Sequence, residues 1–317
     1  MPCTMLTSGR SHAALVLAAL VLLPTPIAAQ DDSEGGWSAA GGHTVLMEQF
    51  TAAWCEICAT VDPWMPEFTE ANGNRVARVA LHDNFEDPLG TPITDYRIQR
   101  YTDGSPSAPS FWFDGSLLAG GAPDRASLHR ELLGAEGDRS SDTKLVLSAA
   151  PIGANSISIS VMLSEWSALE QTQISLFVNR DSVEITDSEA INGIREHHDV
   201  AFAYSEVSLS GLGNWSYAPD DGWGALELQI GAESVILQRT LTLPGGILAD
   251  SLSIVAVHET ESSGQGPSTL GALRLDNPRH DFHGQRLYID DVCDALVGHY
   301  GSGVGVDQDG GDTLLAK

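Results

Sequence analysis

The sequence predicts an α/β domain followed by an all-β sandwich. Its 317 residues are enough for two domains. Segments with strand and helix patterns alternate over residues 43–137, which is typical of an α/β domain. Over residues 140–276, short segments alternate apolar and polar residues between turn residues, which favours a sandwich. We therefore predict one domain in each of these two ranges.

Residues 1–29 have the features of a secretory signal peptide. Arg10 and His12 precede an apolar run at 13–23, and small residues precede a cleavage point after Ala29. An uncleaved membrane anchor is the alternative, but the run is short against the about 20 residues that a spanning helix needs. We expect an exported protein, periplasmic, cell-surface or extracellular, whose mature chain has no transmembrane segment.

The charge balance excludes one class of function. Acidic residues number 43 against 16 Lys and Arg, which gives a formal net charge of −27. A nucleic-acid binder that depends on a basic surface is excluded, because phosphates would be repelled. We therefore expect no nucleic acid among its partners.

The first domain is predicted from local patterns. Residues 30–42 are polar and glycine-rich, and we interpret them as a linker. Asp124 is a good N-cap for the last helix. The expected strands are 43–50, 75–82 and 109–115, and the expected helices are 55–71, 92–101 and 124–133.

The second domain is predicted from period-two alternation. We expect an immunoglobulin-like order of its strands. A C-terminal extension with an acidic tail follows at 277–317. The expected strands are 143–150, 155–163, 172–180, 199–209, 225–230, 234–243, 250–259 and 268–276.

Cys55 and Cys58 form a Cys-x-x-Cys motif between a predicted strand and a predicted helix. Free backbone N–H groups and the helix dipole at such a position stabilise a thiolate, the form that attacks disulfides. Cys58 can then resolve the mixed disulfide. Two alternatives stay open, namely a structural disulfide and a metal site formed with His82.

The string from Glu48 to Phe68 resembles the thioredoxin superfamily. Trp54 precedes Cys55, and Pro63 lies five residues after Cys58, as in that family. Further on, SAPSFWFDG resembles the cis-proline loop and GSLLAGGAPDRASLHRELL the closing hairpin and last helix. The resemblance covers residues 43–135. It implies a thioredoxin-like fold and no cofactor other than the redox-active dithiol.

The same resemblance assigns further residues. It implies that Pro109 follows a cis peptide bond and that Trp54, Ala108 and Pro109 line a substrate groove beside the cysteines. His82 could line this groove or assist proton transfer, although a histidine that caps its loop by hydrogen bonds is the more common arrangement. Tyr96, Tyr101, Phe111 and Trp112 either frame the groove or pack in the core.

Two departures from the family affect the chemistry. Thioredoxins bury an acid six residues before the first cysteine, and Gln49 stands there in this sequence. Glu48 is adjacent, but strand alternation turns it to the opposite face, so proton transfer to Cys58 needs another group or water. Glu56 follows Cys55, and its carboxylate should raise the pKa of the Cys55 thiol.

The whole chain also resembles the twenty-eight-kilodalton outer membrane protein family. The likeness rests on LMEQFTAAWCEIC, VALHDNFEDPLGTPITDY, the cis-proline loop, ISLFVNRDSV and REHHDVAF. It implies a thioredoxin-like domain followed by an immunoglobulin-like sandwich at a cell surface. Two functions follow. One is an exported thiol–disulfide oxidoreductase acting on extracytoplasmic protein disulfides, and the other is a non-enzymatic binding or adhesion protein with a structural Cys55–Cys58 disulfide.

Overall fold

A computed structural model describes most of the chain between residues 36 and 276. The predicted signal peptide, Cys293 and the C-terminal extension at 277–317 lie outside the described residues. The described ranges are 36–101, 107–118, 121–138, 143–165, 171–210, 213–260 and 267–276.

Strands and helices alternate from residue 45 to residue 138, as predicted. Strand β2 pairs with β3 in parallel and with β4 in antiparallel orientation, and β5 pairs with β4. The elements are β2 (Val45–Thr51), α1 (Met65–Asn72), β3 (Val76–His82), α2 (Pro92–Tyr101), β4 (Ser110–Phe113), β5 (Ser116–Leu118) and α3 (Arg125–Asp138). We call residues 43–138 the α/β segment.

The prediction of one helix over residues 55–71 was wrong in its first half. Two short 3₁₀ turns, Cys58–Thr60 and Asp62–Trp64, precede helix α1. Pro63 and Pro66 have no N–H group to donate to the carbonyl four residues earlier, and their rings would clash with it. An α-helix can therefore begin only where Pro66 falls in its first turn.

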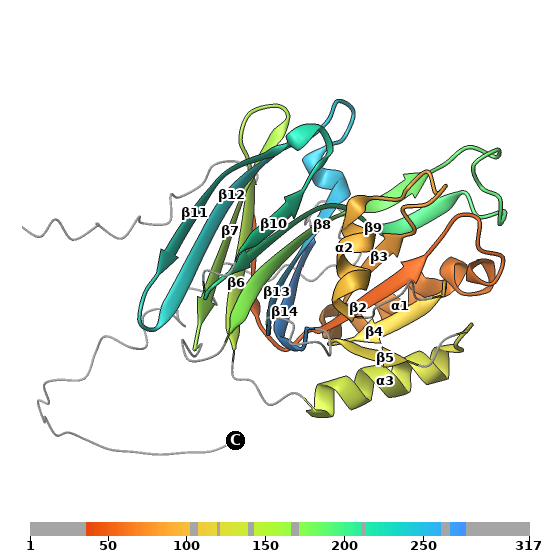
Figure 1. The fold of residues 1–317 in the computed structure, drawn as a ribbon, viewed down its shortest axis with the longest axis horizontal. Helices are drawn as coiled ribbons and strands as arrows, with labels where there is room; N and C mark the ends of the chain where they lie inside the picture. Colours follow the sequence, from red (N-terminus) through yellow and green to blue (C-terminus); the bar gives the residue numbers. More distant parts are fainter. Residues whose placement is uncertain are drawn as a thin grey trace, which may run out of the picture. The chain divides into compact units, whose positions relative to one another are not determined.

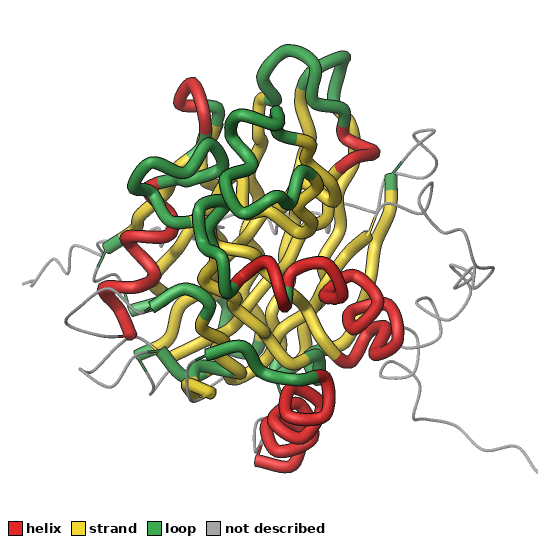
Figure 2. The backbone as a smooth tube through the Cα atoms, turned by 90° about the vertical axis from the view of Figure 1, so that its right-hand side faces the viewer, coloured by secondary structure: helices red, strands yellow, loops and turns green. Residues whose placement is uncertain are grey.

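The helices cover both faces of this part of the sheet (Figure 2). Helices α1 and α3 bury Met65, Phe68 and Leu128 against one face. Helix α2 packs Ile93 against the opposite face. Asp124 caps α3, as predicted, because its carboxylate accepts a hydrogen bond from the Ser127 N–H at 2.7 Å.

The residues from 143 to 276 form mostly strands, and all eight predicted strands are present. We call this part the β segment. One strand, β10 (Asn214–Tyr217), was not predicted. The confirmed strands are β6 (Lys144–Pro151), β7 (Ser156–Ser164), β8 (Thr172–Glu184), β9 (Glu196–Ser208), β11 (Trp223–Ile230), β12 (Ser234–Thr242), β13 (Leu252–Thr260) and β14 (Thr269–Asp276).

These strands form two sheets that enclose an apolar core (Figure 1). One sheet has the order β1-β6-β7-β12-β11, where β1 is Trp37–Gly41, and the other contains β14-β13-β8-β9. Alternate residues of β7, such as Ile157, Ile159 and Val161, are fully buried, while the serines between them are half-buried. This is the period-two pattern from which the sequence predicted the strands.

The interpretation of residues 30–42 as a linker was wrong for Trp37–Gly41. These residues form strand β1, which pairs with β6 in antiparallel register. Trp37 is buried in the sandwich core, and burying this apolar side chain stabilises the strand. In the sequence, the glycines and polar residues around Trp37 do not indicate this burial. The sandwich therefore takes one strand from residues that precede the α/β segment in the chain.

The two segments share one sheet. Strand β3 pairs with β9 through Ala80 and Val200, which joins β5, β4, β2 and β3 to the β14-β13-β8-β9 sheet. Helix α2 packs against residues of both segments, including Phe177 and Val255. The two ranges predicted as separate domains are thus continuous in sheet and core. Within the described ranges, no helix has the length and apolar character needed to cross a bilayer.

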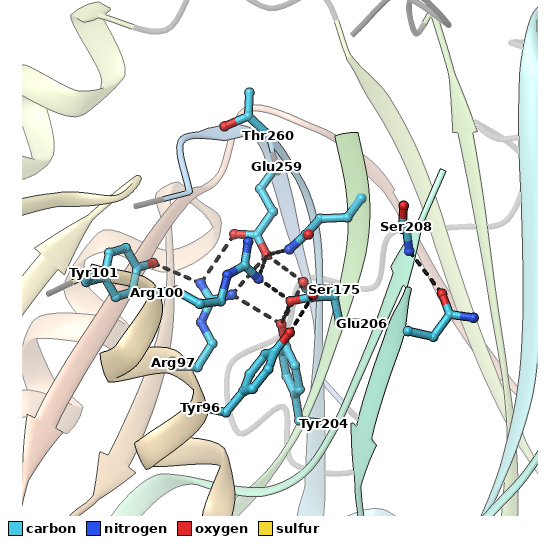
Figure 3. Close-up of polar contacts among 12 residues, drawn as sticks. Tyr96, Arg97, Arg100, Tyr101, Ser175, Tyr204, Glu206, Ser208, Glu259 and Thr260 are labelled. Atoms are coloured by element: carbon cyan, nitrogen blue, oxygen red, sulfur yellow. Dashed lines mark hydrogen bonds and ion pairs between the residues drawn. The ribbon is translucent and has the colours of Figure 1, made fainter. Parts of the chain in front are cut away.

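A buried polar cluster joins α2 to β2 and to the β segment, and Figure 3 shows its β-segment partners. Arg97, fully buried, donates hydrogen bonds to Glu48 at 2.7 Å and to Glu259 at 2.9 Å. Tyr101 donates to Glu48, and Arg97 also contacts the Tyr204 hydroxyl at 3.1 Å. We call these residues the Arg97 cluster. Glu48 therefore faces α2, away from Gln49, as strand alternation predicted.

Candidate disulfide site

Cys55 and Cys58 form a disulfide in the turn that follows β2. The Cys58 N–H points at the Cys55 sulfur, with 3.0 Å between the nitrogen and Sγ. Cys55 is 4% exposed and Cys58 is 0% exposed. Both cysteines are therefore buried, and Cys55 is the slightly less buried of the two.

Of the residues expected to line a groove, Ala108 packs against the two cysteines. The Ala108–Pro109 peptide bond is cis, as predicted, and Ala108 packs against the cluster of Ala52, Cys55 and Cys58. Trp54 is 38% exposed, and its Nε1 donates a hydrogen bond to the Phe85 carbonyl at 3.2 Å.

Glu56 and Pro63, two further residues singled out in the sequence, lie close to the cysteines in the chain. Glu56 is exposed between the two cysteines. Pro63 lies in the second 3₁₀ turn, one residue after the buried Asp62.

The loop between β8 and β9, residues 185–195, reaches the disulfide from the β segment. The Asn192 side chain donates hydrogen bonds to the carbonyls of Ala52 and Cys55, both at 3.2 Å. The Asn192 backbone N–H donates to the Ala53 carbonyl at 2.9 Å. These contacts cross about 140 residues of chain, so the loop takes up the backbone acceptors around the cysteines.

His82, at the end of β3, contacts the loop that follows it. Its Nδ1 lies 3.0 Å from an oxygen of the buried Asp87 carboxylate, which also accepts the Ala53 N–H at 2.7 Å. Burial alone would raise the pKa of Asp87, but His82 and the N–H groups of Ala53 and Leu89 together hold that pKa below its ordinary value. This contact is the loop-capping hydrogen bond weighed in the sequence, while a role of His82 in proton transfer stays a prediction.

A polar array lies beneath the turn of the cysteines. Asp62 accepts hydrogen bonds from Gln49 at 2.5 Å and from Thr51 at 2.8 Å. Arg78 donates to Gln49 at 2.8 Å and forms an ion pair with Asp199 at 3.0 Å. Burial raises the pKa of Asp62, and the hydrogen bond from Thr51 and the charge of Arg78 only partly oppose this effect. Asp62 is thus a buried carboxyl that binds protons more readily than an exposed one.

Asp62 and Arg78 also line a small pocket, with Thr51, His82 and His197, that has room for about one water molecule. The His197 ring packs edge-on against the His82 ring, with 4.8 Å between centroids. Burial and, to a lesser extent, the neighbouring His82 together lower the pKa of His197 to about 4. At neutral pH His197 is therefore uncharged.

The aromatic residues weighed for the groove are packing residues. Tyr101 stacks on Trp112, and Tyr96 stacks on Trp215 of β10 with 4.0 Å between ring centroids. Phe111 is fully buried against α1 and α3.

Four residues of the site were not found from the sequence: Asp62, Arg78, Asp87 and Asn192. Each acts through a partner on another element, and for Asn192 that partner is about 140 positions away. One local feature of the sequence pointed toward them. Gln49 stands where thioredoxins have an acid, so proton transfer to Cys58 needed another group or water. Asp62 now hydrogen-bonds to that Gln49.

No family model and no curated protein matches the chain. Among solved structures, HBP35 of Porphyromonas gingivalis is similar over 78% of this chain and 80% of its own, with 15% identity and a TM-score of 0.57. A carbohydrate binding module family 9 structure from Caldicellulosiruptor kristjanssonii, in complex with cellotriose, is similar over 43% of this chain and 67% of its own. Its identity is 7% and its TM-score 0.28. The first likeness shows a shared two-part fold.

Proposed function

We propose that the protein is an exported thiol–disulfide oxidoreductase that acts on extracytoplasmic protein disulfides. The observation that carries this proposal is the bridge of Cys55 and Cys58 packed against the cis Ala108–Pro109 peptide. Trp54, partly exposed beside this bridge, gives a partner an apolar surface next to the sulfurs. The dithiol itself is the redox group, so the proposal needs no dissociable cofactor.

The order of elements supports the two proposed fold families. In the α/β segment, the cis-proline precedes a closing hairpin and a last helix, the order of a thioredoxin-like domain. In the β segment, β6-β7-β12-β11 corresponds to strands A-B-E-D, and β14-β13-β8 to G-F-C, of an immunoglobulin fold.

The exchange proceeds in two steps from the oxidised form. A thiolate of the partner attacks the Cys55 sulfur, the Cys55–Cys58 bond breaks, and Cys58 leaves as a thiolate that takes up a proton. A second thiolate of the partner then attacks the mixed disulfide. The partner leaves with a disulfide, and the protein keeps both electrons as a dithiol. The reverse sequence reduces a partner disulfide, with Cys55 as the nucleophile.

The proposed location and partners follow from this chemistry. An exported protein works where disulfides persist, outside the reducing cytosol. Repeated turnover in either direction needs an electron-exchange partner in addition to the protein substrate. The β segment serves as the binding module.

The experiment is an equilibrium redox titration of Cys55 and Cys58 in graded thiol/disulfide buffers, read by thiol alkylation. We expect a reversible two-electron couple between about −270 and −120 mV, the range of known exchangers. A Cys58→Ser variant offered a model disulfide should retain a mixed disulfide at Cys55. A bridge that resists reduction well below about −300 mV, with no retained adduct, would refute the proposal.

A second function is favoured by the burial of the pair. Cys55 is only 4% exposed, and Asn192 occupies the Cys55 carbonyl. This arrangement suits a cell-surface binding or adhesion protein whose Cys55–Cys58 disulfide is structural. The outcome that refutes oxidoreductase activity in the titration is the outcome expected for this second function.

A further inference from the structure

Four large apolar side chains face solvent around the disulfide. Trp54 is 38% exposed, Ile57 is 53% exposed, and Phe85 and Ile191 are each 70% exposed. Scattered single apolar residues are ordinary on a protein surface, but a group of them around a reactive bond indicates a binding surface.

Backbone contacts place these four residues around the bridge. Trp54 and Ile57 belong to the turn of the cysteines, and Trp54 is hydrogen-bonded to the backbone of Phe85. Ile191 immediately precedes Asn192, whose backbone and side chain are bonded to the residues around Cys55. The surface therefore has three parts, contributed by the cysteine turn, the β3–α2 loop and the β8–β9 loop. We call these four residues the apolar collar.

The exposed charges next to the collar are mostly negative. Glu56 lies inside the Cys-x-x-Cys motif, Glu86 follows Phe85, and Glu189 lies two residues before Ile191. Asp187 is also exposed in the same loop and is paired with Arg195 at 3.2 Å. A partner with apolar side chains would match the collar, and basic side chains beside them would match its acidic neighbours.

We propose that the apolar collar and its acidic residues bind an extended, cationic polypeptide segment in which apolar residues and Lys or Arg flank a cysteine. The proposal rests on the function proposed above and names the class of its substrate. Ile191 and Glu189 come from the β8–β9 loop, so the β segment contributes directly to substrate choice. Collar contacts hold the segment at Cys55, while Glu56, Glu86 and Glu189 attract its basic side chains.

The test compares two synthetic peptides with the same apolar residues and one internal disulfide, flanked by lysines in one and by glutamates in the other. The reduced full chain is mixed with each peptide, and its oxidation is followed by thiol alkylation. We expect the lysine peptide to react at least about ten-fold faster at low salt. The difference should largely disappear near 1 M salt, where the Debye length is about 3 Å.

Matched variants separate the local surface from the overall negative charge. Glu86→Gln should reduce the preference for the lysine peptide by about two- to five-fold, as expected for one exposed charge pair. Glu227→Gln, an exposed position on strand β11, should leave the preference unchanged. Ile191→Ser should slow both peptides, whereas Ile230→Ser, 52% exposed on β11, should not.

The outcomes are distinguishable. Equal rates for the two peptides, or equal effects of Glu86→Gln and Glu227→Gln, would overturn the binding proposal while leaving the exchange function in place. Exchange with dithiothreitol but with neither peptide would overturn it as well. Failure of the disulfide to exchange with any thiol would refute the proposed function itself.

Discussion

Replacing Glu259 by Gln tests the energetics of the Arg97 cluster. Glu259 is fully buried and accepts hydrogen bonds from Arg97 at 2.9 Å and from Ser175 at 2.5 Å. Burial alone would raise its pKa, but Arg97 and Arg100 outweigh burial and lower it from 4.5 to about 2. Glutamine keeps the shape and most of the hydrogen bonds of this side chain and removes its charge.

The pKa of Glu259 sets the size and the pH range of the effect. Because its folded pKa lies below its unfolded pKa, the ionised carboxylate contributes stability that is complete above about pH 5 and is lost as the pH falls toward 2. The difference of about 2.5 pKa units corresponds to about 3 kcal/mol. We therefore expect Glu259→Gln to lower the free energy of unfolding by up to about 3 kcal/mol at pH 7 and by about 1 kcal/mol at pH 3.

The assay is urea unfolding of the wild-type and variant proteins at pH 7 and pH 3. The dependence of the unfolding free energy on urea concentration is held equal for the two proteins. Glu227→Gln, an exposed residue of β11, is the control and should change stability by less than about 0.5 kcal/mol at either pH. An equal loss at pH 7 and pH 3 for Glu259→Gln would refute the reasoning. Such a result would mean that packing, and not the charge, accounts for the role of Glu259.

Two further predictions concern the disulfide site. Asn192→Ala removes two hydrogen bonds that hold the β8–β9 loop on the cysteine turn. Each is worth about 1 kcal/mol, so dithiothreitol should reduce the bridge up to about thirty-fold faster. An unchanged rate would show that the loop does not limit access. Asp62→Asn removes a buried carboxyl whose pKa is raised by burial. Because the folded state binds this proton more tightly than the unfolded state, Asp62 makes the wild-type protein less stable as the pH rises above about 3.9. The variant should therefore be more stable than the wild type at pH 7 and equal to it near pH 3, as measured by urea unfolding; lower stability at pH 7 would contradict the role assigned to burial.

The sequence was sufficient where structure depends on neighbouring residues. Period-two alternation identified strands such as Ser156–Ser164, and the carboxylate of Asp124 identified the start of α3. The sequence was insufficient where an element depends on a contact with residues far away in the chain. Trp37 forms a strand because β6 lies beside it, and nothing in its polar surroundings indicates that contact.

The candidate site divides in the same way. The cysteines and the cis bond before Pro109 belong to a local motif and were predicted. Asp62 was not predicted, because its importance depends on Gln49, thirteen residues away on another element. Asn192 was not predicted because a loop of the β segment reaches the cysteines only after β3 and β9 have paired.

The β segment contributes to the environment of the cysteines, because its β8–β9 loop contacts the cysteine turn. A binding module attached through a linker would leave the chemistry of the cysteines to the α/β segment alone. Here β9 extends the sheet of the α/β segment, and Asn192 binds the Cys55 carbonyl. Glu259 of β13 pairs with Arg97 of α2 in a buried contact, which would cost several kcal/mol to break. The accessibility of Cys55 is therefore set by the fold of both segments together.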